Sequence, residues 1–190
     1  MNRMMNGPGE DAPLHPELHV GPRRPSARFM LRHPAHLIAL GFGSGLSPFA
    51  PGTVATLWAW LAFVVMQPYM DDQRWAILIG ASLVVGWWAC TVTARNLAQS
   101  DPGAIVWDEV LAFWLILWLV TPTSFWGQAW AFALFRFFDA AKPGPVAWAD
   151  QYFKGHRGEP VTWPQGFGIL FDDLVAALCA LLVLAIGRLL

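Results

Sequence analysis

Long stretches without a charged side chain constrain this sequence more than any other feature. Residues 52–70 and 75–94 carry no charge, and at about 1.5 Å per helical residue each is long enough to cross a hydrocarbon layer of about 30 Å. Further apolar runs cover residues 105–121, 125–138 and 169–187. Only helices and closed barrels satisfy their backbone hydrogen bonds inside a bilayer. Because no strand pattern is present, we predict an all-α, polytopic membrane helical bundle of about four to five apolar helices.

The composition favours a membrane environment. Hydrophobic residues make up 56% of the chain and charged residues only 13%, the reverse of what solvates a small soluble protein. Twelve Trp and thirteen Phe stand against two Tyr, which suits contact with acyl chains and headgroups. A net charge of −1 argues against a nucleic-acid partner, which selects a basic surface. The alternative is a soluble helical protein with a large oligomer interface. Cys90 and Cys179 lie inside apolar runs and are expected to be small buried side chains.

The chain divides into an arm and a single domain. Residues 1–36 contain Pro, Gly, His and five Arg but no apolar run, and we predict a basic arm that is disordered or partly helical. The His15/His19 and His33/His36 pairs have spacings that a metal could use, but in a segment broken by Pro we expect solvated side chains. Residues 37–190 form the membrane domain. Within it, 125–138 is short for a full crossing and leaves a re-entrant segment open, and 141–168 reads as a Pro/Gly-rich loop.

The distribution of Lys and Arg predicts how the chain is threaded. With five crossings and the arm in the cytoplasm, only Arg74 and Arg188 fall on the far side. The cytoplasmic side receives the five arginines of the arm together with Arg95, Arg136, Lys142, Lys154 and Arg157. This bias matches the positive-inside rule. We therefore predict a multi-pass protein of the cell inner (cytoplasmic) membrane, with the N-terminus inside and the C-terminus outside.

Five carboxylates lie at the ends of the apolar runs: Asp108, Glu109, Asp139, Asp172 and Asp173. Acids at a hydrocarbon boundary are costly and tend to be functional. A single acid in a first helical turn is explained by the helix dipole, but adjacent like charges repel unless a cation lies between them. The predicted threading brings all five to the cytoplasmic face. Hard divalent cations prefer carboxylate oxygens, so we expect a metal at this face.

Two cations accompany these acids. Arg136, Asp139 and Lys142 recur at i, i+3 and i+6, close to one helix face. A salt-bridged helix end is one explanation and contributes little when exposed. The functional explanation is that Asp139 binds metal while Arg136 and Lys142 hold phosphate oxygens.

A glycine-rich segment, GFGSGLSPFAPGT at residues 41–53, precedes the first long run. Closely spaced glycines let backbone N–H groups converge on an anion, and Thr53 stands where a helix would begin. The Lys-Ser/Thr ending of a nucleotide P-loop is missing. Ser44, Ser47 and Thr53 are candidate phosphate donors, and a flexible turn before a membrane helix is the alternative.

Four segments in order resemble the motifs of the phosphatidylglycerophosphatase A family: GFGSGLSPFAPGT (41–53), IVWDE (105–109), FRFFDAAKP (135–143) and GFGILFDD (166–173). The resemblance covers the chain from about residue 37 to its last run. It implies an all-helical, Mg²⁺-dependent membrane phosphatase that hydrolyses phosphatidylglycerophosphate to phosphatidylglycerol and inorganic phosphate in phospholipid biosynthesis. The loop 151–164 looks longer than is usual in the family, and Gln165-Gly166-Phe167 stands where a Gly-Gly pair is common.

The predicted mechanism is metal-assisted hydrolysis of a phosphomonoester. We expect catalytic roles for the five acids and Mg²⁺ binding by Asp108, Glu109, Asp139 and Asp172. We expect substrate binding by Ser44, Ser47, Thr53, Arg136 and Lys142. No covalent nucleophile is evident, although an aspartyl intermediate stays open, as does a homo-oligomer.

Two other classes are weighed against this one. A small acid-lined transporter predicts acids spread through the depth of the spans, whereas these gather at one boundary. A CDP-alcohol phosphotransferase, another lipid-headgroup phosphotransfer enzyme, expects a D-G-x2-A-R … G-x3-D-x3-D signature that Asp172-Asp173 does not match. A structural subunit of a membrane complex would need no converging acids.

Overall fold

The computed structural model describes residues 24–99, 102–153 and 161–189. Within these ranges all regular elements are helical, as predicted. Two are short 3₁₀ segments, η1 (Gly41–Leu46) and η2 (Gln67–Tyr69). The α-helices are α1 (Ala27–Met30), α2 (Pro34–Ala39), α3 (Pro51–Met66), α4 (Asp72–Leu97), α5 (Trp107–Val120), α6 (Phe125–Ala141), α7 (Pro145–Tyr152) and α8 (Trp163–Leu189).

Helix α5 is the core of the molecule. It contacts α3, α4, α6 and α8, and Val110, Ala112, Phe113 and Ile116 on different sides of it are fully buried. A helix that is apolar all round is expected to be surrounded by others. Helix α5 is therefore held in place by the other four long helices.

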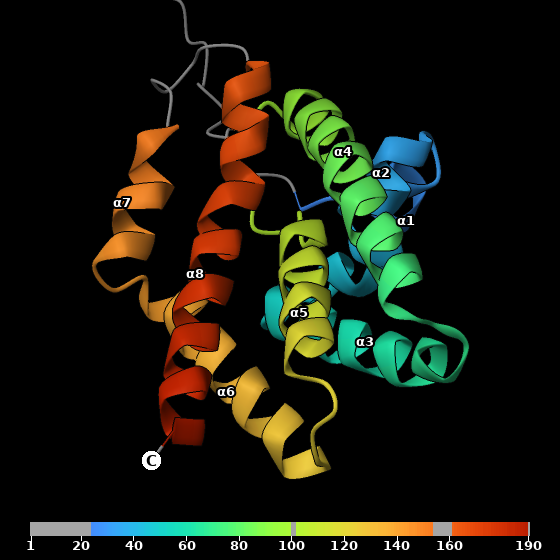
Figure 1. Cartoon of the computed structure of the whole chain (residues 1–190). Helices are drawn as coiled ribbons and strands as arrows, with labels where there is room; N and C mark the ends of the chain where they lie inside the picture. The colour runs from blue at the N-terminus through green and yellow to red at the C-terminus, as the bar shows by residue number, and fades with distance from the viewer. Residues whose placement is uncertain (1–23, 100–101, 154–160, 190) are drawn as a thin grey trace, which may run out of the picture.

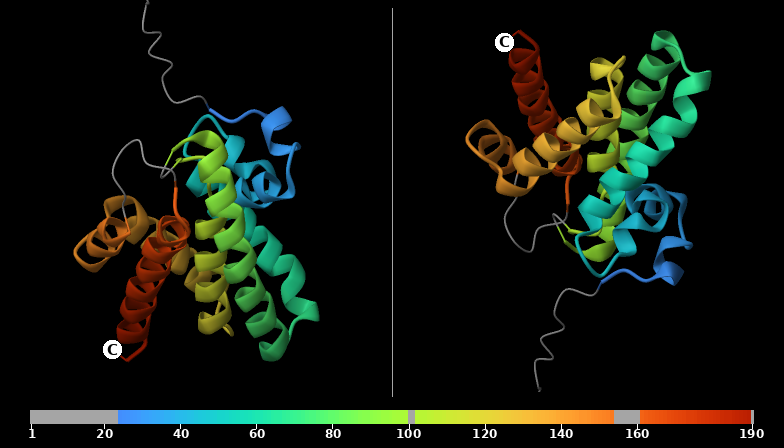
Figure 2. Two further views of the ribbon diagram at one scale, coloured as in Figure 1. Left: turned by 90° about the horizontal axis from the view of Figure 1, so that it is seen from above. Right: turned by 90° about the horizontal axis from the view of Figure 1, so that it is seen from below.

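The long helices alternate in direction (Figure 1). The end of α4 and the start of α8 lie near the top of this view, the start of α5 lies at about mid-height, and the start of α6 and the chain's C-terminus lie near the bottom. Helix α7 stands against α8, and α1 and α2 lie beside α4. The views in Figure 2 show the same grouping from above and below. The arrangement brings the first turn of α5 and the last turn of α6 towards α8.

Two helices are long and apolar enough to cross a membrane: α4, with a mean hydropathy of 1.8 in its most apolar window, and α8, with 2.5. Large apolar side chains are exposed on the outside of the bundle, among them Leu61, Val84 and Ile186. Helix α3 has 16 residues, α5 has 14 and α6 has 17, which gives lengths of roughly 20–26 Å against about 30 Å of hydrocarbon.

Two boundaries differ from the sequence-based expectation. Helix α8 begins at Trp163 rather than near residue 169, and α7 lies inside the predicted loop 141–168. In both cases a proline stands in the first turn, Pro145 in α7 and Pro164 in α8. Proline is favoured there because the first helical N–H has no partner within the helix. The acids Asp172 and Asp173 consequently lie in the third turn of α8 and not in its first.

The arm differs in part from the expectation of solvated histidines. Residues 24–36 contain α1 and the start of α2, and His36 is buried. Its Nδ1 lies 3.0 Å from the Phe29 carbonyl oxygen and its Nε2 lies 2.8 Å from Asn96 Nδ2, so partners on both sides replace water. His15 and His19 lie outside the described residues. Cys90 is fully buried, as predicted, and Cys179 is half-buried.

Candidate active site

Three carboxylates from two helices converge inside the bundle. Asp108 and Glu109 project from the first turn of α5, and Asp173 projects from α8. One oxygen of each lies within 4.8 Å of the other two. Asp108 Oδ1, Glu109 Oε2 and Asp173 Oδ2 are buried and have no hydrogen-bond partner among the described residues. Buried carboxylate oxygens without donors are costly and repel one another, so this carboxylate pocket (Asp108, Glu109 and Asp173) has the chemistry of a cation site.

Arg136 lies at the edge of the carboxylate pocket. This residue is in the last turns of α6, where its Nη1 donates to Asp139 Oδ2 and lies 3.9 Å from Glu109 Oε1. The three side chains are between 13% and 20% exposed. The Asp139 carboxylate also lies beside that of Asp173. A partly buried guanidinium between two carboxylates keeps donors available for two oxygens of a phosphate group.

Lys142 forms a second ion cluster with Asp172 and Asp150. Its Nζ donates to Asp172 Oδ2 and to Asp150 Oδ1, both at 2.6 Å. Burial alone would lower the pKa of Lys142, but the hydrogen bonds that its Nζ donates to Asp150 and Asp172 outweigh burial and raise the pKa above its ordinary value. The ammonium is therefore charged at neutral pH. Asp172, which we predicted as a metal ligand, is paired with Lys142 and is not one of the three converging acids. Its role as a ligand stays a prediction.

The start of α3 reaches the same place. A Cβ atom on Gly52 would collide with Glu109 Oε1 and would lie 3.2 Å from both terminal nitrogens of Arg136. Only a residue without a side chain allows this approach. The free N–H groups in the first turn of a helix favour an anion, and in α3 this turn contains Gly52 and Thr53.

The predicted hydroxyl donors have local partners. Ser44 Oγ donates to the Gly41 carbonyl oxygen at 2.8 Å, and Ser47 Oγ donates to that of Phe49 at 2.7 Å. These bonds stabilise the glycine-rich segment itself, in which Gly41 and Gly43 have positive φ. Thr53 is half-buried beside Gly52. The substrate-binding roles of the three hydroxyls stay predictions.

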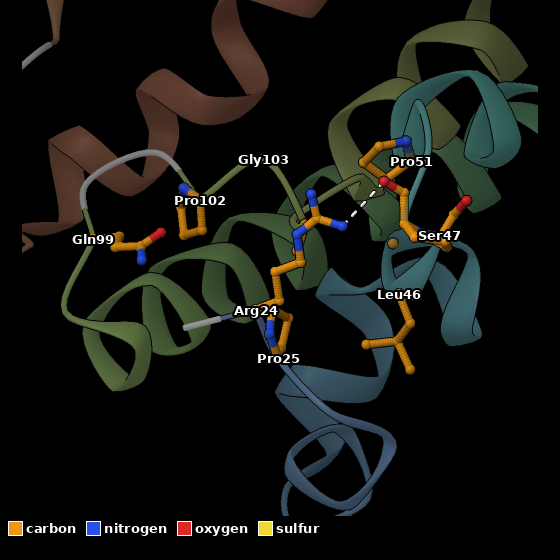
Figure 3. A pocket seen from close by; sticks show the side chains of 11 residues that line it. Arg24, Pro25, Leu46, Ser47, Pro51, Gln99, Pro102 and Gly103 are labelled. Carbon is orange, nitrogen blue, oxygen red and sulfur yellow. Dashed lines mark hydrogen bonds between the residues drawn. The ribbon is translucent and has the colours of Figure 1, made fainter. Parts of the chain in front are cut away.

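A cavity of about 300 Å³ adjoins the glycine-rich segment (Figure 3). Its wall includes Arg24, Ser47, Gln99 and Pro51, and Arg24 Nη1 donates to the Pro48 carbonyl oxygen at 3.0 Å. No carboxylate lines this cavity among the described residues. It ends at Pro51, one residue before Gly52, and so reaches the segment that contacts Glu109 and Arg136.

The sequence-based prediction missed Asp150. This residue lies in the predicted loop, outside the four motifs, and no spacing rule connects it with Lys142 eight positions earlier. Its one signal in the sequence is Pro145, which is typical of a helix start. A helix beginning there has Asp150 in its second turn, near the side formed by Val146 and Ala149.

Comparison with known proteins defines first a class and then a family. Two curated relatives are bacterial phosphatases, each named phosphatidylglycerophosphatase A. The Escherichia coli protein is 36% identical over 79% of this chain and 81% of its own length, and the Haemophilus influenzae protein is 34% identical over 84% and 91%. A Bacteroides thetaiotaomicron protein, provisionally named a phosphatidylinositol-3-phosphatase, is 36% identical over 80% and 92%.

The family model of phosphatidylglycerophosphatase A matches residues 37–188. This chain therefore belongs to the phosphatidylglycerophosphatase A family, as its motifs indicated. No solved structure was found to match it.

Proposed function

We propose that this protein is a Mg²⁺-dependent phosphatase of the cell inner membrane that hydrolyses phosphatidylglycerophosphate to phosphatidylglycerol and inorganic phosphate, a step of phospholipid biosynthesis. Family membership and the names of the relatives support the phosphatase activity and the lipid substrate. The carboxylate pocket supports the dependence on a divalent cation.

The observation that carries the proposal is the set of three buried, unpartnered carboxylate oxygens on Asp108, Glu109 and Asp173. Hard oxygen donors in a small pocket fit Mg²⁺, which takes one or two carboxylates together with phosphate and water. We therefore assign these three residues as the ligands, with Asp139 next to them. When bound, the ion neutralises the headgroup phosphate and makes a water molecule more acidic.

The remaining residues bind and orient the phosphate. Arg136 offers a planar set of donors at the edge of the pocket, and Asp139 holds this guanidinium in place. Lys142 supplies a fixed positive charge on the adjoining side. The first turn of α3 adds backbone N–H groups beside Arg136. Together these groups stabilise negative charge on the transferring phosphoryl oxygens.

The position of the site suits a lipid substrate. The pocket acids lie in the first turn of α5 and the third turn of α8, nearer the start of each helix than its end, and we assign the side on which these helices begin to the cytoplasm. The diacylglycerol tails then stay in the bilayer while the headgroup phosphate reaches the pocket. Gathering of the acids near one end argues against an ion pathway through the membrane.

The first prediction concerns the ligands. Asp108→Asn and Asp173→Asn each remove one charge of the pocket without changing its volume. We expect each variant to release phosphate from phosphatidylglycerophosphate at least about 100-fold more slowly than wild type, the usual scale for a lost electrostatic group in an active site. The measurement is phosphate release by purified protein in mixed micelles, with Mg²⁺ and with chelator.

Asp71→Asn is the matched control, because Asp71 is an exposed acid that caps α4 at the opposite end and Asn caps equally well. Full activity in either site variant would remove that residue from the pocket. Activity without any divalent cation would overturn the metal assignment. Faster hydrolysis of phosphatidylinositol 3-phosphate than of phosphatidylglycerophosphate would overturn the proposed substrate but not the proposed reaction, hydrolysis of a phosphomonoester.

A further inference from the structure

One ammonium connects three helices through Asp172, the sequence neighbour of the pocket acid Asp173. Lys142 follows the last residue of α6, Asp150 lies on α7 and Asp172 lies on α8. Lys142 adopts a left-handed backbone conformation, with φ of 44°, which is uncommon for a residue with a side chain. Its backbone N–H still bonds the Phe138 carbonyl oxygen at 2.9 Å. The lysine is thus fixed at both ends, by its backbone and by its Nζ.

Asp150 is held in position by the packing of α7 on α8. Val146 and Ala149, on the same side of α7, are fully buried. Just beyond the helix, the ring of Phe153 packs against Phe167 and Phe171 on α8, with centroids 5.7 and 5.4 Å apart. The Asp150 carboxylate is therefore a rigid acceptor, with its side chain only 13% exposed.

Two carboxylates place a lysine more narrowly than one. A lysine carries its charge on a flexible four-carbon side chain. The ammonium is therefore mobile unless several hydrogen bonds fix it. The ammonium has three donors, and Asp150 and Asp172 accept two of them. Without Asp150, the ammonium would keep Asp172 as its acceptor and would be placed less narrowly.

We propose that Asp150 is a positioning residue for phosphate hydrolysis, an assignment that rests on the proposed function. Together with Asp172, Asp150 holds the Lys142 ammonium at the edge of the pocket and leaves its third hydrogen for an oxygen of the substrate phosphate. Helix α7 is then part of the catalytic machinery and not merely a connection between α6 and α8.

The kinetic test is a double-mutant cycle in the full-length protein. Asp150→Asn should lower kcat/KM for phosphatidylglycerophosphate about 10- to 100-fold, the range seen when an outer partner of a functional group is lost. In a Lys142→Gln background the same change should have no further effect beyond about twofold, because Asp150 acts through Lys142. Asp150→Glu should restore part of the activity. Gln151→Ala, on the exposed side of α7, is the control and should match wild type.

An equal loss from Asp150→Asn in both backgrounds would show a structural role and overturn the proposal, as would unchanged activity in the single variant. A second measurement needs no substrate. In ¹⁵N-lysine-labelled protein, Lys142 and Lys154 are the lysines of the chain, and the Lys142 ammonium hydrogens should exchange slowly with water. Asp150→Asn should abolish this protection and Gln151→Ala should preserve it.

Equal protection in wild type and Asp150→Asn would contradict the positioning role, whatever the activity. Loss of protection in Asp150→Asn, combined with no phosphate release by wild type, would overturn the proposed function while supporting the hold of Asp150 on Lys142.

Discussion

At the scale of single residues, the absence of a side chain at Gly52 matters as much as the acids. Helix α3 enters the site at this point, and Glu109 Oε1 and the Arg136 guanidinium occupy the space where a Cβ would lie. The backbone of Gly52 is helical, so alanine would fit its conformation and would even favour the helix. The requirement for glycine comes from the site and not from the fold.

The close contact at Gly52 makes the site sensitive to a single added methyl group. Gly52→Ala should lower kcat/KM at least about tenfold, because the new methyl group pushes Glu109 and Arg136 away from the phosphate, and displacements of about 1 Å at a reacting centre have effects of this size. The thermal midpoint should not fall by more than a few degrees. Gly80→Ala, at a helical position with open space around it, is the control. Wild-type activity in Gly52→Ala would mean that the substrate phosphate does not bind at the start of α3.

Several site residues could be predicted from the sequence because acids next to long apolar runs are rare. Asp108, Glu109, Arg136 and Asp139 do lie together. The sequence could not decide between Asp172 and Asp173, since neighbours on a helix point about 100° apart and only packing shows which one faces the pocket. The Lys142–Asp150 ion pair could not be predicted from the sequence either, because it depends on how α7 packs on α8.

At the scale of elements, glycines set the spacing between helices. Gly86 on α4 faces Trp107 on α5 and Leu170 on α8, and a Cβ there would lie 2.7 Å from Trp107 Nε1 and 3.2 Å from Leu170 Cδ2. Trp107 directly precedes Asp108, and its indole N–H donates to the Ser82 carbonyl oxygen at 3.1 Å. The contact between α4 and α5 therefore positions the first carboxylate.

We predict that Gly86→Ala destabilises the protein by about 1–3 kcal/mol, the usual cost of overpacking, and lowers activity by displacing Trp107. Gly80→Ala on the same helix should leave the thermal midpoint unchanged or raise it, because nothing lies near its Cβ position and alanine favours helix. Thermal unfolding of the two variants in one detergent gives the comparison. Equal midpoints for Gly80→Ala and Gly86→Ala would rule out close packing at Gly86.

Most helices could be predicted from apolar runs, whereas α7 and the first turns of α8 could not. Both segments combine Pro and Gly, which are typical of loops. In α8 the glycines serve packing instead: a Cβ on Gly166 would collide with the Thr91 side chain of α4, and one on Gly168 would lie 2.5 Å from Phe153 Cβ. Such contacts join residues far apart in the sequence, so local composition does not indicate them.

At the scale of the whole molecule, the threading predicted from Lys and Arg stays a prediction, and α4 offers the sharpest test of it. Helix α4 has 26 residues and a length of about 39 Å, enough to place its two ends on opposite sides of a bilayer. Gln73 lies in its first turn and Gln99 lies just beyond its end.

We therefore predict opposite accessibility for Gln73→Cys and Gln99→Cys. A membrane-impermeant maleimide should label Gln73→Cys in intact cells and should label Gln99→Cys only after the membrane is opened. The unsubstituted protein is the control, because it shows how much label the native Cys90 and Cys179 take up. The reverse pattern would place the carboxylate pocket outside the cytoplasm. Labelling of both variants in intact cells would contradict a crossing by α4.

The distribution of the three pocket acids along the chain has a consequence for biogenesis. Two belong to α5, and the third arrives only with α8, the last helix to be synthesised. When the first six α-helices have been synthesised, two of the three carboxylates are present and the pocket still lacks Asp173. We therefore expect the pocket to be complete only after α8 has packed against α5.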